Sequence, residues 1–165
     1  MEQLSTTTQN LPADGDETKI VTETIQYIVI RLGGEQYGID INFIDNNVRM
    51  QHITRIPKVP TYLKGVINLR GEVIPVMSLR LRMGLEEDQI GRSTRIIILK
   101  LGEEGNVGVL VDEVREVVKL PVDKIEKTAH GKSGDKTMFV NAVGKNGDEL
   151  ISLLDLSTIT LEENA

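Results

Sequence analysis

Short runs of β-branched and aliphatic residues, separated by turns rich in Gly, Asn and Pro, dominate the chain from about residue 24. Thr24–Leu32 is typical, because its apolar residues partly alternate and it ends at Gly33-Gly34. Such runs predict β-strands, and the glycines predict the turns between them. Further runs of this kind are Tyr37–Ile41, Tyr62–Ile67, Glu72–Arg80, Arg95–Leu101, Val107–Val111, Met138–Gly144 and Glu149–Leu154.

Two other segments place apolar residues three and four positions apart, which is the period of an amphipathic helix. The residues concerned are Ile41, Ile44 and Val48 in one segment, and Val114, Val117 and Val118 in the other. The sequence therefore predicts short helices over residues 42–50 and after Val111. A third short helix is predicted from Asp155 to Glu163, capped by Asp155 or Ser157.

The two halves of the chain resemble each other. Tyr37–Ile41 matches Val107–Val111, each followed by the same helical spacing, and Val73–Leu79 matches Leu150–Leu156. The order strand, turn, strand, short helix and hairpin thus occurs twice. We expect a mostly β fold with short helices, in which two small barrels share a core. We expect the two barrels to be intertwined, with limits of roughly 24–90 and 91–156, after a disordered N-terminal tail of residues 1–19.

Composition narrows the possible functions. The 165 residues suit one domain or two small ones, and 19 basic against 25 acidic residues give a formal charge of -6. An acidic chain with 3% aromatic residues is a poor candidate for binding nucleic acid. The absence of Cys excludes disulfides and thiolate metal sites. The chain has neither a signal peptide nor a run long enough to span a membrane, so a soluble cytoplasmic protein is expected.

Catalytic chemistry finds little support in the sequence. His52 and His130 each lack a second ligand at helical spacing. Gly131-Lys132-Ser133 resembles the end of a phosphate-binding loop, but Glu126 stands where the first glycine is needed. We therefore expect no enzyme activity, no cofactor and no metal.

The turn Asn68-Leu69-Arg70-Gly71 is a stronger candidate for function. It can be a plain hairpin turn, or it can present Arg70 to a partner's carboxylate or carbonyl groups. The stripe of Val114, Val117 and Val118 is equally open to two interpretations. These valines can be simple core, or they can form the wall of a groove that accepts a partner helix.

Long segments of the chain resemble the CheW family, the coupling adaptors of bacterial chemotaxis. The resemblance runs from about Thr24 to Leu161 and is carried by Tyr37–Ile41, Ile53–Pro57 and Leu63–Val76. It implies two five-stranded SH3-like barrels around one core and a non-catalytic scaffold, monomeric alone. The implied partners are the regulatory domain of the histidine kinase CheA and the cytoplasmic tip of methyl-accepting chemoreceptors, in an array at the inner face of the membrane.

The same resemblance implies which residues bind the partners. They are Asn68, Arg70 and Gly71 in the turn, Gly108, Val114 and Val117 in the second barrel, and Ile44 and Asn46 in the first. The chain departs from the family in one place. Asn46 stands where the family usually has Glu, and Asn47 stands where it has an apolar residue. The same fold could also serve a different array, such as one for surface motility, or, as a further alternative, bind a small ligand.

Overall fold

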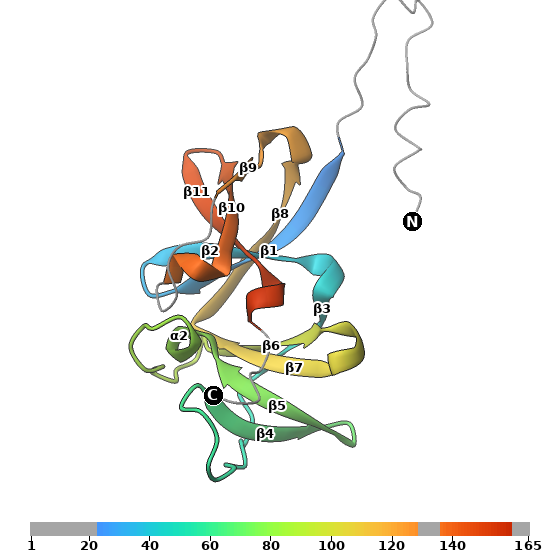
Figure 1. Cartoon of the computed structure of the whole chain (residues 1–165), viewed down its shortest axis with the longest axis vertical. Coiled ribbons are helices and arrows are strands. Elements are labelled where there is room, and N and C mark those ends of the chain that lie inside the picture. The colour runs from blue at the N-terminus through green and yellow to red at the C-terminus, as the bar shows by residue number, and fades with distance from the viewer. Residues whose placement is uncertain (1–22, 129–135, 160–165) are drawn as a thin grey trace, which may run out of the picture.

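The computed structural model describes residues 23–128 and 136–159 (Figure 1). The predicted tail of residues 1–19, His130 and Gly131-Lys132-Ser133 lie outside the described residues. Two sheets make up most of this part of the chain, which confirms the mostly β fold class. Sheet A has the strand order β8-β1-β2-β11-β10-β9, and sheet B has the order β3-β6-β7-β5-β4.

The strands are short, as their sequences predict. Those of sheet A are β1 Thr24–Leu32, β2 Glu35–Asp40, β8 Glu113–Pro121, β9 Glu126–Lys127, β10 Val140–Asn146 and β11 Glu149–Leu154. Those of sheet B are β3 Ile44–Arg49, β4 Leu63–Leu69, β5 Glu72–Ser78, β6 Arg95–Lys100 and β7 Asn106–Val111. Short helices join them: η1 Ile41–Phe43, α2 Leu79–Arg82, η2 Gly102–Glu104, η3 Val122–Lys124, η4 Lys136–Phe139 and η5 Leu156–Thr158.

Sheet B closes on itself just beyond β3. The amide of Thr54 donates to the carbonyl of Val66 in β4, and the amide of Val66 donates back, both at 2.8 Å. Gly65 makes this approach possible, since a Cβ at that position would lie 2.1 Å from the Thr54 carbonyl oxygen. The two edges of the sheet therefore meet, which forms barrel B.

The internal duplication is confirmed at the level of strand register. Gly38 in β2 lies opposite Leu153 in a parallel pairing with β11. Gly108 in β7 lies opposite Val76 in the same kind of pairing with β5. These four residues hold equivalent positions in the two repeated sequences, so the repeats fold alike.

The sheets do not divide at residue 90. Sheet A combines the N-terminal hairpin β1–β2 with the C-terminal strands β8–β11, whereas sheet B combines β3–β5 with the hairpin β6–β7. The first hairpin of each repeat therefore lies in the sheet that is built from the later strands of the other repeat. The expected barrel limits 24–90 and 91–156 therefore do not match the two sheets, because each sheet takes strands from both ranges.

The helices predicted over 42–50 and after Val111 are wrong, because β3 and β8 are strands. Each strand has an irregular register near its start. In β8 the bulge at Arg115 adds one residue, so Val114 and Val117 face the same side although they are three positions apart. A bulged strand thus imitates the helical spacing. Of the predicted C-terminal helix, η5 is described, with Asp155 as its cap, while 160–163 lie outside the described residues.

The core has three parts. One cluster of buried side chains lies between the sheets and takes residues from both, which supports the predicted shared core. A second consists of side chains from the strands of sheet A, packed around Val29, Ile151 and Leu153. A third fills barrel B around Val76, Ile96 and Ile98. No helix among the described residues is long and apolar enough to cross a membrane.

Candidate functional site

The turn between β4 and β5 is a tight hairpin loop at the end of sheet B, far from the β10–β11 hairpin (Figure 1). Leu69 pairs with Glu72, which leaves Arg70 and Gly71 as the loop. Their φ angles are 53° and 83°, as a type I′ turn requires. The side-chain oxygen of Asn68 accepts a hydrogen bond from the Gly71 amide at 3.1 Å. Asn68 and Gly71 are thus explained by the geometry of the turn.

Arg70 is not explained by the turn. A positive φ favours Gly or Asn, and a longer side chain pays a steric penalty there. The Arg70 side chain is exposed, and the described part of the chain gives it no ion-pair partner. A strained residue with an exposed cationic group indicates a role outside the fold.

An apolar patch lies beside Arg70. Val73 pairs with Asn68 and is 63% exposed, and Val66 and Pro75 face the same outer side of the hairpin, half-buried. We call Val66, Asn68, Arg70, Val73 and Pro75 the hairpin surface. Its apolar strip next to a cation suits a protein partner. The sequence motif contained Val73 without marking it as exposed, although the period-2 alternation of β5 would have placed it outside.

The predicted residues of the edge strands occupy equivalent positions. Ile44 of β3 and Val114 of β8 are both half-buried and both pack against the cluster between the sheets. Three residues further on, Val117 is 54% exposed, and Asn47 is exposed at the equivalent position of β3. The edge of the cluster between the sheets is thus apolar along β8 and polar along β3. We call these two edges the β8 rim and the β3 rim.

Two predicted residues lie elsewhere. Asn46 lies opposite Ile98, which belongs to the interior of barrel B, and it is half-buried. Gly108 is buried inside barrel B, where a Cβ would lie 2.8 Å from Cγ2 of Ile96. The resemblance implied that Gly108 is among the partner-binding residues, but the glycine is buried inside barrel B. Gly108 allows β5, β6 and β7 to pack closely.

A charged cluster closes one junction between the sheets. Arg80 of α2 donates to both carboxylate oxygens of Asp112, at 2.8 and 2.7 Å. This pairing lowers the pKa of Asp112 and raises that of Arg80. Nearby, Ser78 donates a hydrogen bond to Asp88, yet burial dominates and raises the pKa of Asp88. These groups hold segments together and leave Ser78 committed to a carboxylate and to the α2 cap.

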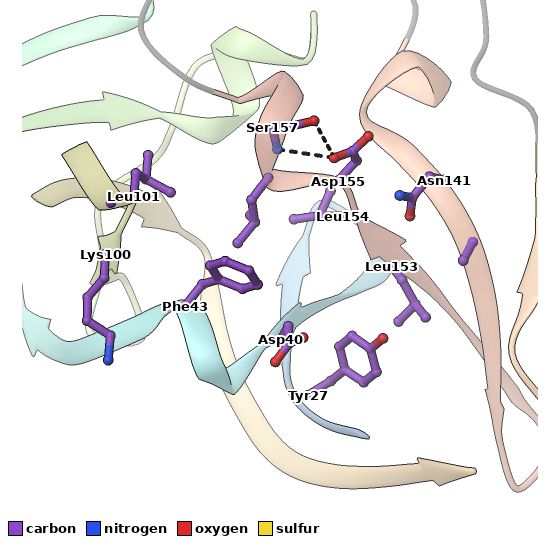
Figure 2. A pocket seen from close by; sticks show the side chains of 13 residues that line it. Tyr27, Asp40, Phe43, Lys100, Leu101, Asn141, Leu153, Leu154, Asp155 and Ser157 are labelled. Carbon is purple, nitrogen blue, oxygen red and sulfur yellow. Dashed lines mark hydrogen bonds between the residues drawn. The ribbon is translucent and has the colours of Figure 1, made fainter. Parts of the chain in front are cut away.

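A cavity of about 700 Å³ lies at a second junction (Figure 2). Figure 2 shows Phe43 near its middle, with Asp40 and Tyr27 on one side and Asp155 on the other. Burial raises the pKa of the Tyr27 hydroxyl, and the charge of Asp40 adds to this shift. Among the described residues, no group of three or more His, Cys, Asp or Glu side chains could hold a metal ion. The sequence did not predict this cavity, because its walls come from both repeats.

Known proteins resemble this chain over most of its length. The family model for the CheW-like domain matches residues 26–163. Chemotaxis protein CheW of Bacillus subtilis (strain 168) is 33% identical over 138 residues, which cover 84% of this chain and 88% of the relative. Protein FrzA of Myxococcus xanthus is 28% identical over 137 residues, which cover 81% and 84%.

A solved structure has the same fold. The crystal structure of scaffolding protein TtCheW from Thermoanaerobacter tengcongensis superposes with a TM-score of 0.73 at 34% identity. The superposition covers 81% of this chain and 90% of that one.

Proposed function

Because the chain belongs to the CheW-like domain family, we propose that it is a non-catalytic adaptor that couples chemoreceptors to the histidine kinase CheA. Its partners are the regulatory domain of the kinase and the cytoplasmic tip of methyl-accepting receptors. The protein then acts in the cytoplasm, at the receptor array on the inner face of the membrane. This proposal rests on the relatives named for chemotaxis and on the surfaces described above.

Arg70 carries the proposal. It stays in a strained turn that Gly or Asn would fill better, and it projects beside the exposed Val73. Interface anchors combine a forked cation with apolar contact in this way. We assign the hairpin surface to partner binding and the β8 rim, with Val114 and Val117, to a helical partner.

The test is calorimetric titration of the protein into the CheA regulatory domain from the same organism, with and without the receptor tip. We expect saturable one-to-one binding, with the receptor joining the complex without displacing the kinase. Arg70→Asn should weaken binding of at least one partner by about tenfold or more. Asn suits the positive φ, so this variant should unfold at a temperature equal to or above that of the wild type.

Arg92→Asn is the matched control, because Arg92 is also exposed but lies in the loop before β6. It should leave both affinities unchanged. Equal affinities for Arg70→Asn and Arg92→Asn would remove Arg70 from the interface. Failure of the wild-type protein to bind the kinase domain at all would contradict the coupling role.

A second candidate is an adaptor of the same kind in a different signalling array. It is favoured by the similarity to Protein FrzA, a relative that is not named for chemotaxis. It is also favoured by the polar β3 rim, where Asn47 lies at the position equivalent to Val117 in β8. Titration against kinases and receptors encoded beside the gene would separate the two candidates, since each adaptor should bind its own set.

A further inference from the structure

Two arginines lie directly opposite each other at the end of the β3 rim. Arg49 is the last residue of β3, and it pairs with Arg95, the first residue of β6. Residues that are directly opposite in an antiparallel pair lie on the same face, so both side chains belong to one side of sheet B. Like charges in such a pair repel each other and lower the stability of the sheet. We call Arg49 and Arg95 the arginine pair.

The arginine pair lies on the face of sheet B that meets sheet A. Ile97, two residues after Arg95, belongs to the cluster of buried side chains between the sheets, and so does Val111, which is opposite Arg95 in β7. β8 begins two residues after Val111, at the end of sheet B where β6 begins (Figure 1). The arginine pair is therefore at the start of the β8 rim.

The described part of the chain supplies no acid to the arginine pair. Neither of its members takes part in an ion pair with a described residue. The acids that directly follow β7 are engaged elsewhere, since Asp112 is bound by Arg80 and Glu113 forms an ion pair with Arg31. Two neighbouring cations without an acid are unexpected in a chain with a formal charge of -6.

The guanidinium group of Arg95 is held in place by the backbone. Its Nη1 donates to the carbonyls of Arg92 and Thr94, at 2.8 and 2.9 Å. Nε and Nη2 have no acceptor among residues 23–128 and 136–159. These two nitrogens form one edge of the guanidinium group, which is the fork that binds a carboxylate. The fork of Arg95 is therefore oriented and open.

The internal repeat shows that the fold does not require two arginines here. Ile44 and Val114 hold equivalent positions, and in this register Arg49 corresponds to Lys119 of β8. Arg95 corresponds in the same way to Gln26 of β1, which lies directly opposite Lys119. The other repeat thus has one cation facing a neutral side chain at this place, and the second cation is particular to β3 and β6.

We propose that Arg49 and Arg95 bind a carboxylate of a helical protein partner, beside the apolar contact that this helix makes with the β8 rim. The helix carries Glu or Asp next to its apolar stripe. A carboxylate between the two guanidinium groups offsets their repulsion, so the arginine pair stabilises the complex and not the free protein. The exposed Val117 and the negative charge of the chain favour such a helix over a polyanion.

This inference rests on the proposed receptor partner of the β8 rim and adds the charge that the partner must present. The test is calorimetric titration with the receptor tip at about 50 and about 300 mM NaCl. Arg49→Gln removes one cation and no hydrogen bond among the described residues. It should weaken binding by about tenfold at low salt and by less at high salt.

Thermal unfolding separates a binding role from a structural one. Arg49→Gln leaves a neutral residue opposite an arginine, as the other repeat has at Gln26 and Lys119. Its melting temperature should equal or exceed that of the wild type, because the repulsion is gone. A lower melting temperature together with weaker binding would show that Arg49 supports the fold and would overturn the proposal.

Arg92→Gln is the matched control, since it makes the same chemical change at an exposed residue in the loop before β6. It should change the affinity for the receptor tip by less than about twofold. Arg95→Gln should lose affinity as Arg49→Gln does. If Arg49→Gln and Arg92→Gln bind the tip equally well, the proposal is wrong.

Variants of the receptor tip locate the contact on the partner. Each Glu is replaced in turn by Gln and each Asp by Asn, and each variant is titrated against the wild type and against Arg49→Gln. One acid should lose about tenfold against the wild type and little against Arg49→Gln, because both changes remove the same contact. Additive losses for every acid would contradict the assignment.

The CheA regulatory domain distinguishes this inference from the proposed function. Arg49→Gln should bind that domain with the wild-type affinity. Undiminished binding of the receptor tip by Arg49→Gln would refute the carboxylate contact alone and leave the coupling role standing. Failure of the wild-type protein to bind the tip would refute both. A loss confined to the kinase domain would assign the arginine pair to that partner and overturn the proposal.

Discussion

Asp112, between β7 and β8, holds α2 and the β1–β2 turn to its own segment through its carboxylate. It accepts from Arg80 and from the Gly33 amide, and these bonds lower its pKa. A carboxyl group with a lowered pKa stabilises the fold above its unfolded pKa of about 4 and loses that effect as the pH falls through the folded pKa. Asp88, whose pKa is raised by burial, has the opposite sign.

We therefore expect Asp112→Asn to lower the free energy of unfolding by about 1–2 kcal/mol at pH 7. The Arg80 and Asp112 side chains keep 18% and 25% of their exposure, so the loss should be smaller than for a fully buried pair. The difference from the wild type should shrink as the pH falls below about 4, the unfolded pKa, and through the lower pKa of Asp112 in the fold. Urea unfolding from pH 3 to pH 8 measures this.

Asp88→Asn provides the comparison. Ionisation of Asp88 is unfavourable in the fold, so the wild type should lose stability relative to this variant as the pH rises above about 4. If both variants gave the same pH profile, the two carboxylates would not have the environments that the structure shows.

Sequence and structure agree unevenly at the residue scale. The turn residues Asn68 and Gly71 have a recognisable chemistry, so the hairpin was predictable. The buried location of Gly108 was not predictable, because glycine occurs both at surfaces and inside barrels. Only the packing of Ile96 and Val76 around it tells which.

At the scale of the element, β8 shows why a period can mislead. Its bulge places Val114 and Val117 on one face, and Val118 points into the interior of sheet A, opposite Tyr27. A local pattern of three and four is common to an amphipathic helix and to a bulged strand. Only the pairing with β1, distant in the sequence, decides between them.

The alternation along β8 leads to a matched pair of variants. Val117→Asp changes a side chain that is 54% exposed and should lower stability by less than about 1 kcal/mol. Val118→Asp places a carboxylate at a position that is 8% exposed and should lower stability by about 3 kcal/mol or more. Thermal unfolding of the two proteins checks this, and equal losses would show that Val117 is core.

The whole molecule consists of two repeats that exchange their first hairpins. The sequence predicted the repeats, because their strands match in pattern and in spacing. Although intertwined barrels were expected, the sequence did not predict which hairpins are exchanged, because a hairpin such as β1–β2 has the same internal pattern whichever sheet it joins. The cavity depends on the same exchange and stayed hidden for the same reason.

The exchange predicts how the chain behaves when it is divided. A cut at Ile90, which is 56% exposed in a loop, interrupts no strand or helix. Fragments 1–90 and 91–165 should each show little β structure alone, since sheets A and B both need strands from the two fragments. Mixing them should restore the native circular dichroism spectrum. Cooperative unfolding of either isolated fragment would contradict this expectation.

The exchanged hairpins also bear on the origin of the molecule. A single ancestral unit could have completed its sheet only with the hairpin of a second copy, as a two-fold symmetric, domain-swapped dimer. Gene fusion would have turned this concentration-dependent assembly into an intramolecular one. The copies were then free to diverge, with Asn47 and Arg80 in the first repeat and Val117 and Ser157 in the second. An obligate dimer with two identical junctions between its sheets thereby became one chain in which the two junctions differ.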